Sequence, residues 1–150
     1  MMIEKLKNRT ELSQNKKYGK VSSKMQDLIV ALNKKEIPDE YVSVINDDVK
    51  NLNSFFGTDK QLIKLTKKTT AKILKFVDTK LKLVSKHHYR NVGMIMGMLF
   101  GPIVTLPFDG FGYSGLGLVL GMAIGIGIGT NLDAKAAKEG KQLDVEHIGY

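Results

Sequence analysis

The sequence of 150 residues contains no cysteine, no tryptophan and only three prolines. Without cysteine the chain has neither disulfide bonds nor a cysteine-ligated zinc site. Charge is also missing from a long central stretch, because residues 92–130 include a single charged residue, Asp109. These absences exclude a disulfide-stabilised scaffold and indicate that charge is confined to another part of the chain.

Charge and glycine are divided between two parts of the chain. Residues 1–90 contain 20 Lys and Arg against 10 Asp and Glu, whereas residues 92–130 contain 11 of the 15 glycines. This composition predicts an all-α protein, with a basic juxtamembrane helical bundle followed by a two-helix transmembrane hairpin. The expected domains are a basic cytosolic helical domain over residues 1–90, the hairpin over residues 91–132 and a short cytosolic tail over residues 133–150.

Two uncharged runs define the expected hairpin. Residues 92–108 and 111–130 contain 17 and 20 residues without a charge. As helices they would extend about 25 and 30 Å, against a bilayer hydrocarbon core of about 30 Å. The second run is long enough to span. The first needs flanking residues to do so, or enters the bilayer only part of the way. The alternative is a buried helical hairpin of a soluble protein.

Glycines recur every fourth residue in both runs. Residues four apart lie on one face of a helix, so each run presents a face without side chains. In lipid, close backbone approach through small residues is a common route to helix association. The pattern therefore predicts two glycine-zipper helices and self-association. The expected packing and oligomerisation residues are Gly93, Gly97, Gly101, Gly117, Gly121, Gly125 and Gly129.

Basic residues flank the runs and are absent between them. Lys80, Lys82, Lys86 and Arg90 precede the first run, and Lys135, Lys138 and Lys141 follow the second. Positive residues favour the cytoplasmic side, so both termini are expected in the cytoplasm and the connecting turn outside. That turn, around residues 107–113, is rich in glycine and in aromatic residues suited to the headgroup level.

Four helices are expected in the basic part, over about residues 2–14, 22–35, 38–56 and 59–90. The apolar pattern of the second helix is Met25, Leu28, Ile29 and Leu32, and that of the third is Tyr41, Val44, Ile45, Val49, Leu52 and Phe56. Thr58 and Gln61 have the spacing of a capping box for the fourth helix. Its apolar residues, such as Leu62, Ile73 and Phe76, recur at helical spacing and predict packing against the preceding helices. No proline separates this helix from the first uncharged run, so one continuous helix into the membrane is a further expectation.

The other face of the fourth helix is basic. Its positive residues are expected to contact either an anionic membrane surface or a protein partner. Nucleic-acid binding is the rival interpretation, and the near absence of arginine and of aromatic residues on the charged side argues against it. The expected contact residues are Lys64, Lys67, Lys68, Lys72, Lys75, Lys82, Lys86 and Arg90.

Sequence patterns typical of enzymes do not find their required context here. Residues 110–115 fit the glycine spacing of a dinucleotide-binding loop, but neither a preceding strand nor a βαβ unit is indicated. His87 and His88 are adjacent, so on a helix they diverge by about 100° and do not chelate one ion together. We therefore predict no catalytic residue, no metal site and no cofactor.

The segment from residue 121 to 144 resembles the closing part of small bacterial glycine-zipper membrane proteins of uncharacterised function, and the resemblance extends at most over residues 93–144. It implies an integral protein of the bacterial inner membrane that self-associates. The expected function is a non-enzymatic scaffold or subunit of a membrane complex, with a membrane-permeabilising or channel-forming protein as the alternative. The residues that carry the resemblance are Gly121, Ala123, Ile124, Gly125, Ile128, Gly129, Thr130, Asp133, Lys135, Ala136, Glu139, Gly140, Gln142 and Leu143.

Overall fold

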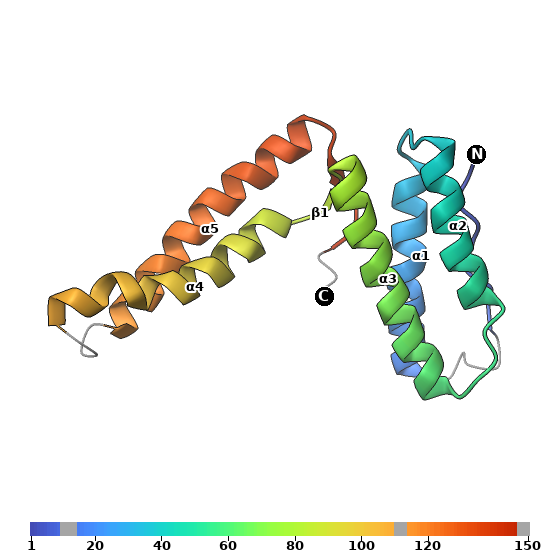
Figure 1. Cartoon of the computed structure of the whole chain (residues 1–150), viewed down its shortest axis with the longest axis horizontal. Coiled ribbons are helices and arrows are strands. Elements are labelled where there is room, and N and C mark those ends of the chain that lie inside the picture. The colour runs from blue at the N-terminus through green and yellow to red at the C-terminus, as the bar shows by residue number, and fades with distance from the viewer. Residues whose placement is uncertain (10–14, 110–113, 147–150) are drawn as a thin grey trace. The chain divides into compact units, whose positions relative to one another are not determined.

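The computed structural model describes residues 1–9, 15–109 and 114–146, with the backbone alone at residues 106, 108, 109 and 114. These residues are mainly helical, which confirms the all-α prediction (Figure 1). Two short strands, β1 and β2, pair with each other. The elements are α1 (Lys16–Asn33), α2 (Asp39–Asn53), α3 (Asp59–Leu81), β1 (Val84–Ser85), α4 (His88–Asp109), α5 (Ser114–Lys138) and β2 (Gln142–Leu143).

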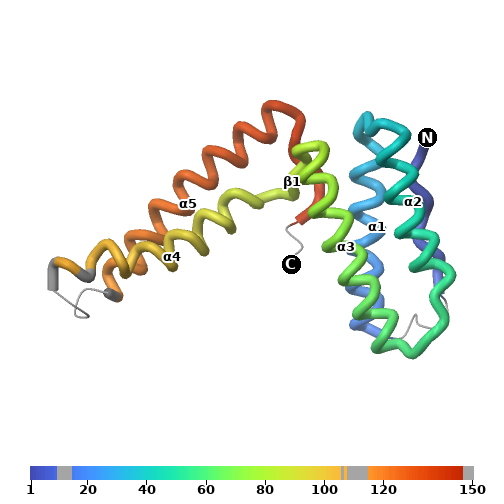
Figure 2. Tube along the Cα trace, viewed as in Figure 1, coloured from blue at the N-terminus to red at the C-terminus, as the bar shows by residue number. Residues whose placement is uncertain are grey.

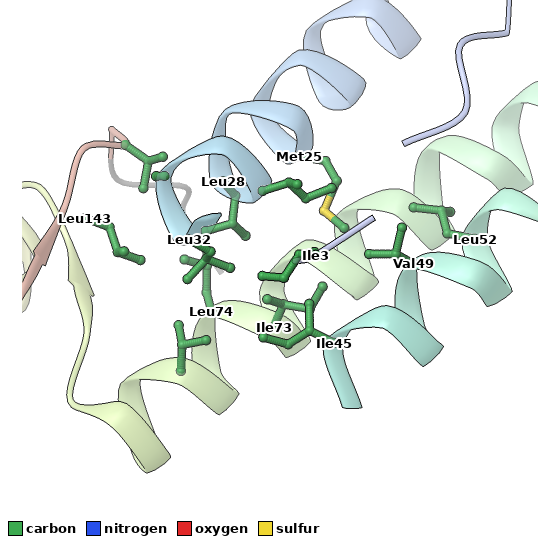
Figure 3. Close-up of a cluster of buried hydrophobic side chains, with 14 of the residues drawn as sticks. Ile3, Met25, Leu28, Leu32, Ile45, Val49, Leu52, Ile73, Leu74 and Leu143 are labelled. Atoms are coloured by element: carbon green, nitrogen blue, oxygen red, sulfur yellow. The ribbon is translucent and has the colours of Figure 1, made fainter. Parts of the chain in front are cut away.

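The chain forms two units. The N-terminal unit contains residues 1–83 together with the described residues from Leu143 onward, and the hairpin unit contains residues 84–142. In the N-terminal unit α3 packs against both α1 and α2. Large aliphatic side chains fill the space between the three helices (Figure 3). Fully buried members include Met25, Leu28, Ile29, Leu32, Ile45, Val49, Leu52, Ile73 and Val77.

The apolar pattern predicted the buried faces of α1 and α3 well, but that of α2 only in part. Val44 is 43% exposed and Phe56 is 90% exposed, although both belong to the predicted apolar pattern. The predicted Ile45, Val49 and Leu52 are buried, and they are joined by Val42, which the predicted pattern leaves out. Val42, Ile45 and Val49 lie on one side of the helix at three- and four-residue spacing. Phe56 lies beyond the last residue of α2 and so leaves this face.

Helix ends follow local hydrogen bonds. The Asn15 side chain accepts hydrogen bonds from the Lys17 and Tyr18 amides, so α1 begins at Lys16 rather than near Ser22 as predicted. The capping box between Thr58 and Gln61 is present at the start of α3, as predicted. Phe76 of α3 is only partly buried, and its ring lies at 75° to the ring of Tyr41 with a centroid distance of 5.7 Å.

The expectation of one continuous helix over residues 59–90 and into the apolar run is wrong. Helix α3 ends at Leu81, and Lys82 adopts a left-handed conformation with φ of 54°. His87, just before α4, also has a positive φ of 59°. Two such residues interrupt helical hydrogen bonding, which sequence patterns rarely reveal when neither residue is glycine. The basic residues therefore divide between α3, the segment 82–87 and the start of α4.

The first and last parts of the basic unit also differ from expectation. Residues 1–9 are not helical, and residues 10–14 lie outside the described part. Leu143 is fully buried and Val145 is 5% exposed, and both belong to the core of the N-terminal unit. Over its described residues, 133–146, the predicted tail contains the last turns of α5 and a segment that packs into this core.

Candidate functional site

Helices α4 and α5 pack side by side in antiparallel directions (Figure 2). Their contact follows the glycines in a regular register: Gly93 lies against Gly125, Gly97 against Gly121 and Gly101 against Gly117. A step of four residues along α4 is matched by a step of four in the reverse direction along α5. At each of these levels the backbones themselves are in contact.

These glycines have no room for a larger residue. A Cβ atom on Gly93 or Gly97 would fall on the carbonyl oxygen of the glycine opposite, and one on Gly121 would meet both the Gly97 carbonyl and the Gly101 Cα. Gly129 extends the series, because its Cβ position is occupied by the Tyr89 backbone. All seven predicted packing glycines therefore lie in the contact between two helices of one chain, and their role in oligomerisation stays a prediction.

Gly127 of α5 has a different environment. A Cβ there would meet no atom within 4 Å, and the same holds for Gly115. Both glycines lie away from α4, although they belong to the same helix as the packed ones. Gly127 is therefore a matched control for substitutions of the glycines that contact α4, because it lies on the same helix but has open space around it.

The large apolar side chains of α4 and α5 point outward. Leu99, Val104 and Ile124 are 61%, 67% and 62% exposed. Within the described part of the chain, the segment Gly115–Lys138 is long and apolar enough to span a membrane, and only 11% of its most apolar window is buried. Over its described residues, the predicted first span in α4 is not long and apolar enough by the same criterion. A two-span hairpin therefore stays a prediction.

One side of the hairpin is an apolar groove of about 560 Å³. Glycines form its floor, and every fourth residue of each helix contributes a larger side chain to its walls. These wall residues are Val92, Met96, Phe100 and Val104 from α4, and Leu120, Ile124, Ile128 and Leu132 from α5.

Asp133 joins the two helices at the open end of the hairpin. Its two carboxylate oxygens accept hydrogen bonds from the backbone amides of Tyr89 and Arg90, at 3.0 and 2.9 Å. The side chain is 6% exposed. A carboxylate from α5 thus satisfies free amides in the first turn of α4 and complements its helix dipole. Sequence reasoning missed this role, because the capping residue lies 44 positions away.

The predicted basic contact residues do not form one continuous helical face. Five of them, Lys64, Lys67, Lys68, Lys72 and Lys75, are exposed on α3. Lys72 forms an ion pair with Asp48 of α2 at 2.6 Å. Lys82 is the C-cap of α3, whereas the partly buried Lys86 and Arg90 belong to the hairpin unit.

The residues just after α5 include an ion pair. The Lys141 ammonium donates a hydrogen bond to Glu139 Oε2 at 2.7 Å. This hydrogen bond and the positive charge of Lys141 lower the pKa of Glu139, and Glu139 in turn raises the pKa of Lys141. Both side chains are exposed, so their attraction is screened by water and salt.

Residues expected at the turn, including Phe108, Asp109 and Tyr113, fall outside what is described of the side chains. The described residues contain no group of three or more His, Asp or Glu placed to hold a metal ion. No family model, curated protein or solved structure matches this chain.

Proposed function

We propose that the protein is a non-enzymatic integral membrane protein of the bacterial inner membrane, in which α4 and α5 cross the bilayer as a glycine-zipper hairpin. Its N-terminal unit is cytoplasmic and carries a basic surface. The protein acts as a scaffold or as a subunit of a membrane complex, with lipid, further copies of itself and other subunits as its partners.

The observation that carries this proposal is the inverted distribution of side chains in the hairpin. Glycines make the helix contact, while large aliphatic side chains such as Leu99, Val104 and Ile124 are exposed. In water this arrangement leaves a large apolar surface unfavourably hydrated. In a bilayer the same side chains contact lipid at no such cost, and backbone contact stabilises the helix pair. Lipid is therefore the solvent that fits this hairpin.

The path of the chain supports a shared side for both ends of the hairpin. The chain leaves the N-terminal unit after Leu83, and Leu143 contributes to the same core. A segment that starts from and returns to one folded unit crosses the membrane an even number of times. Lysines before α4 and after α5 favour the cytoplasmic side for that unit.

Single cysteines test this topology directly, because the natural chain contains none. Ser23→Cys and Lys141→Cys should react with an impermeant maleimide only from the cytoplasmic side, and Ser114→Cys only from the opposite side. Labelling of Ser114→Cys from the same side as Lys141→Cys would refute the two-span hairpin. Labelling of each variant after detergent solubilisation serves as the control for reactivity.

Retention of a dye by liposomes distinguishes the scaffold from the channel-forming alternative. The glycine faces lie against each other within one chain, which leaves the outward apolar side chains for lipid. We therefore expect liposomes that contain the full chain to keep an entrapped dye as well as protein-free liposomes do. Release that increases with protein concentration, and that Gly121→Leu alters, would favour the channel.

The basic surface is tested with the full chain in membranes. If α3 lysines contact anionic headgroups, their protection from an amine-reactive reagent should be greater in anionic than in neutral vesicles and should decline with salt, since the Debye length falls from about 10 Å at 0.1 M to about 3 Å at 1 M. Equal protection in both vesicles would indicate a protein partner instead. The experiment needs the full chain, because a fragment without the hairpin and the residues after it would lack Leu143 from the core of the N-terminal unit.

A further inference from the structure

Residues 1–9 are held against α1 and α2 by side-chain amides. The Asn33 amide accepts a hydrogen bond from the Ile3 N–H and donates one to the Ile3 carbonyl, at 2.8 and 3.0 Å. Asn46 accepts from the Glu4 N–H and donates to the Met2 carbonyl. Primary amides present a donor and an acceptor side by side, as a peptide group does, so each pairs with main chain.

The same pairing of side-chain amides with main chain continues along residues 5–7; we call this series of hydrogen bonds the amide ladder. Asn53 accepts from the Lys7 N–H and donates to the Lys5 carbonyl, at 2.8 and 3.1 Å. Gln26 of α1 accepts from the Leu6 N–H. Hydrogen bonds of this kind recognise extended backbone whatever its side chains are, which is how strand-like peptides are bound at sheet edges.

Three side chains add specificity at every third position. Ile3 is 3% exposed and enters the core (Figure 3), and Leu6 packs against that core. The Arg9 guanidinium donates to carbonyls at the end of α2, including that of Phe55 at 2.8 Å. Carbonyls in and just after the last turn of a helix have few amide partners, so a guanidinium can bind them. The Leu52 carbonyl also accepts a hydrogen bond from the Phe55 N–H, at 3.3 Å. Ile3, Leu6 and Arg9 thus contact the surface at a spacing of three residues.

The segment is not enclosed by the helices that hold it. Apart from Ile3, Leu6 and Arg9 its residues are exposed. An open pocket of about 310 Å³ is lined by residues 5–9 together with Tyr18, Ser22 and Ser23 of α1. Segments with few buried apolar contacts open at a lower free energy than the helices around them.

We propose that the surface between α1 and α2 is a peptide-binding site, that residues 1–9 are its intramolecular ligand, and that residues 1–9 of a second copy bind it in exchange. Residues 1–9 of a second copy fit the surface because they have the same backbone, isoleucine, leucine and arginine as the segment that the structure shows bound there. Exchange reproduces every contact of the resting chain, and exchange of an identical element is a low-cost route to association.

Isotope mixing tests the exchange in the full chain. Equal amounts of ¹⁴N and ¹⁵N chains in detergent micelles are incubated together and treated with a zero-length carbodiimide, which joins carboxylates to adjacent amines. Glu4 Oε1 lies 3.5 Å from Lys50 Nζ, so a cross-link between these side chains shows that the segment is bound at its site. Asp48 and Lys72 lie 2.6 Å apart between α2 and α3, and serve as the matched control.

We expect mixed-isotope products at Glu4–Lys50 and only same-isotope products at Asp48–Lys72. Same-isotope products alone at Glu4–Lys50 would overturn the proposal and make residues 1–9 a fixed part of the fold. Mixed products at both pairs would also overturn it, because they indicate exchange of whole helices. A synthetic nonapeptide of residues 1–9 should suppress the mixed Glu4–Lys50 product, and a peptide of scrambled sequence should not.

A variant of the site tests backbone recognition. Asn53→Ala removes the two hydrogen bonds to Lys5 and Lys7 at a partly exposed position, so the fold should persist. The rate at which mixed-isotope Glu4–Lys50 product forms should rise about threefold, because the loss of modest hydrogen bonds makes release of the segment easier. An unchanged rate would refute the amide ladder as the source of binding.

Discussion

The two units of this protein place large and small side chains in opposite ways. In the N-terminal unit the fully buried residues are large, such as Met25, Leu28 and Ile73. In the hairpin, α4 and α5 meet through glycines, and residues such as Leu99 and Ile124 are exposed. Burial of large aliphatic groups is driven by water, and this drive disappears in lipid. The membrane location proposed for the hairpin accounts for this difference between the two units.

The largest expected effect comes from Gly121→Leu, because the new side chain meets the backbone of Gly97 and Gly101. We expect the α4–α5 contact to be lost. Spin labels on Leu99→Cys and Val119→Cys, both exposed positions, should then report a longer distance and a broader distribution. Gly127→Leu gains the same helix propensity at an open position and should leave the distance unchanged. Equal effects of the two substitutions would contradict the glycine contact.

The N-terminal unit should respond instead to the loss of large groups. Leu143→Ala removes a fully buried side chain from its core and should lower the free energy of unfolding by about 2–5 kcal/mol. Denaturant unfolding followed by circular dichroism measures this change. Val30→Ala, at a position 45% exposed, is the control and should have a much smaller effect. A negligible effect at Leu143 would show that the C-terminal segment is not part of the core.

A smaller effect is expected at Asp133, where the hairpin uses polar rather than apolar contact. Asp133→Ala leaves the Tyr89 and Arg90 amides without their partner and should cost about 1–2 kcal/mol, as loss of a helix cap does. Faster hydrogen exchange at those two amides is the direct readout. Asp133→Asn keeps one acceptor and should recover part of the protection. If Ala and the natural residue gave equal exchange, the capping role would be refuted.

The smallest effect concerns the exposed pair Glu139 and Lys141. Because Lys141 lowers the pKa of Glu139, the pair contributes stability above the ordinary glutamate pKa, and this contribution is lost as pH falls through the lowered value. An NMR titration of the Glu139 carboxyl carbon should show this depressed pKa. In Lys141→Gln the pKa of Glu139 should move back toward its ordinary value, whereas Lys138→Gln serves as the control.

Regular patterns in the sequence predicted the parts of the structure that depend on periodicity. The fourfold glycine spacing marks the α4–α5 contact, and the apolar spacing of α3 marks its buried face. Contacts between distant residues left no such pattern. The Asp133 cap, the Asn33 and Asn46 amides on residues 1–9, and the positive φ of Lys82 each depend on tertiary context. Without these contacts the sequence predicts one helix for the basic residues, whereas the structure divides them between several segments.

The burial of Leu143 and Val145 has a consequence for the order of events during synthesis. Ribosomes make the chain from its N-terminus, so α1, α2 and α3 emerge before the hairpin, whereas these two core residues emerge after it. The core of the N-terminal unit thus becomes complete only after both hairpin helices have been made. Synthesis of the whole hairpin is in this way a precondition for full stability of the N-terminal unit, and a chain that stalls in the hairpin has an incomplete core.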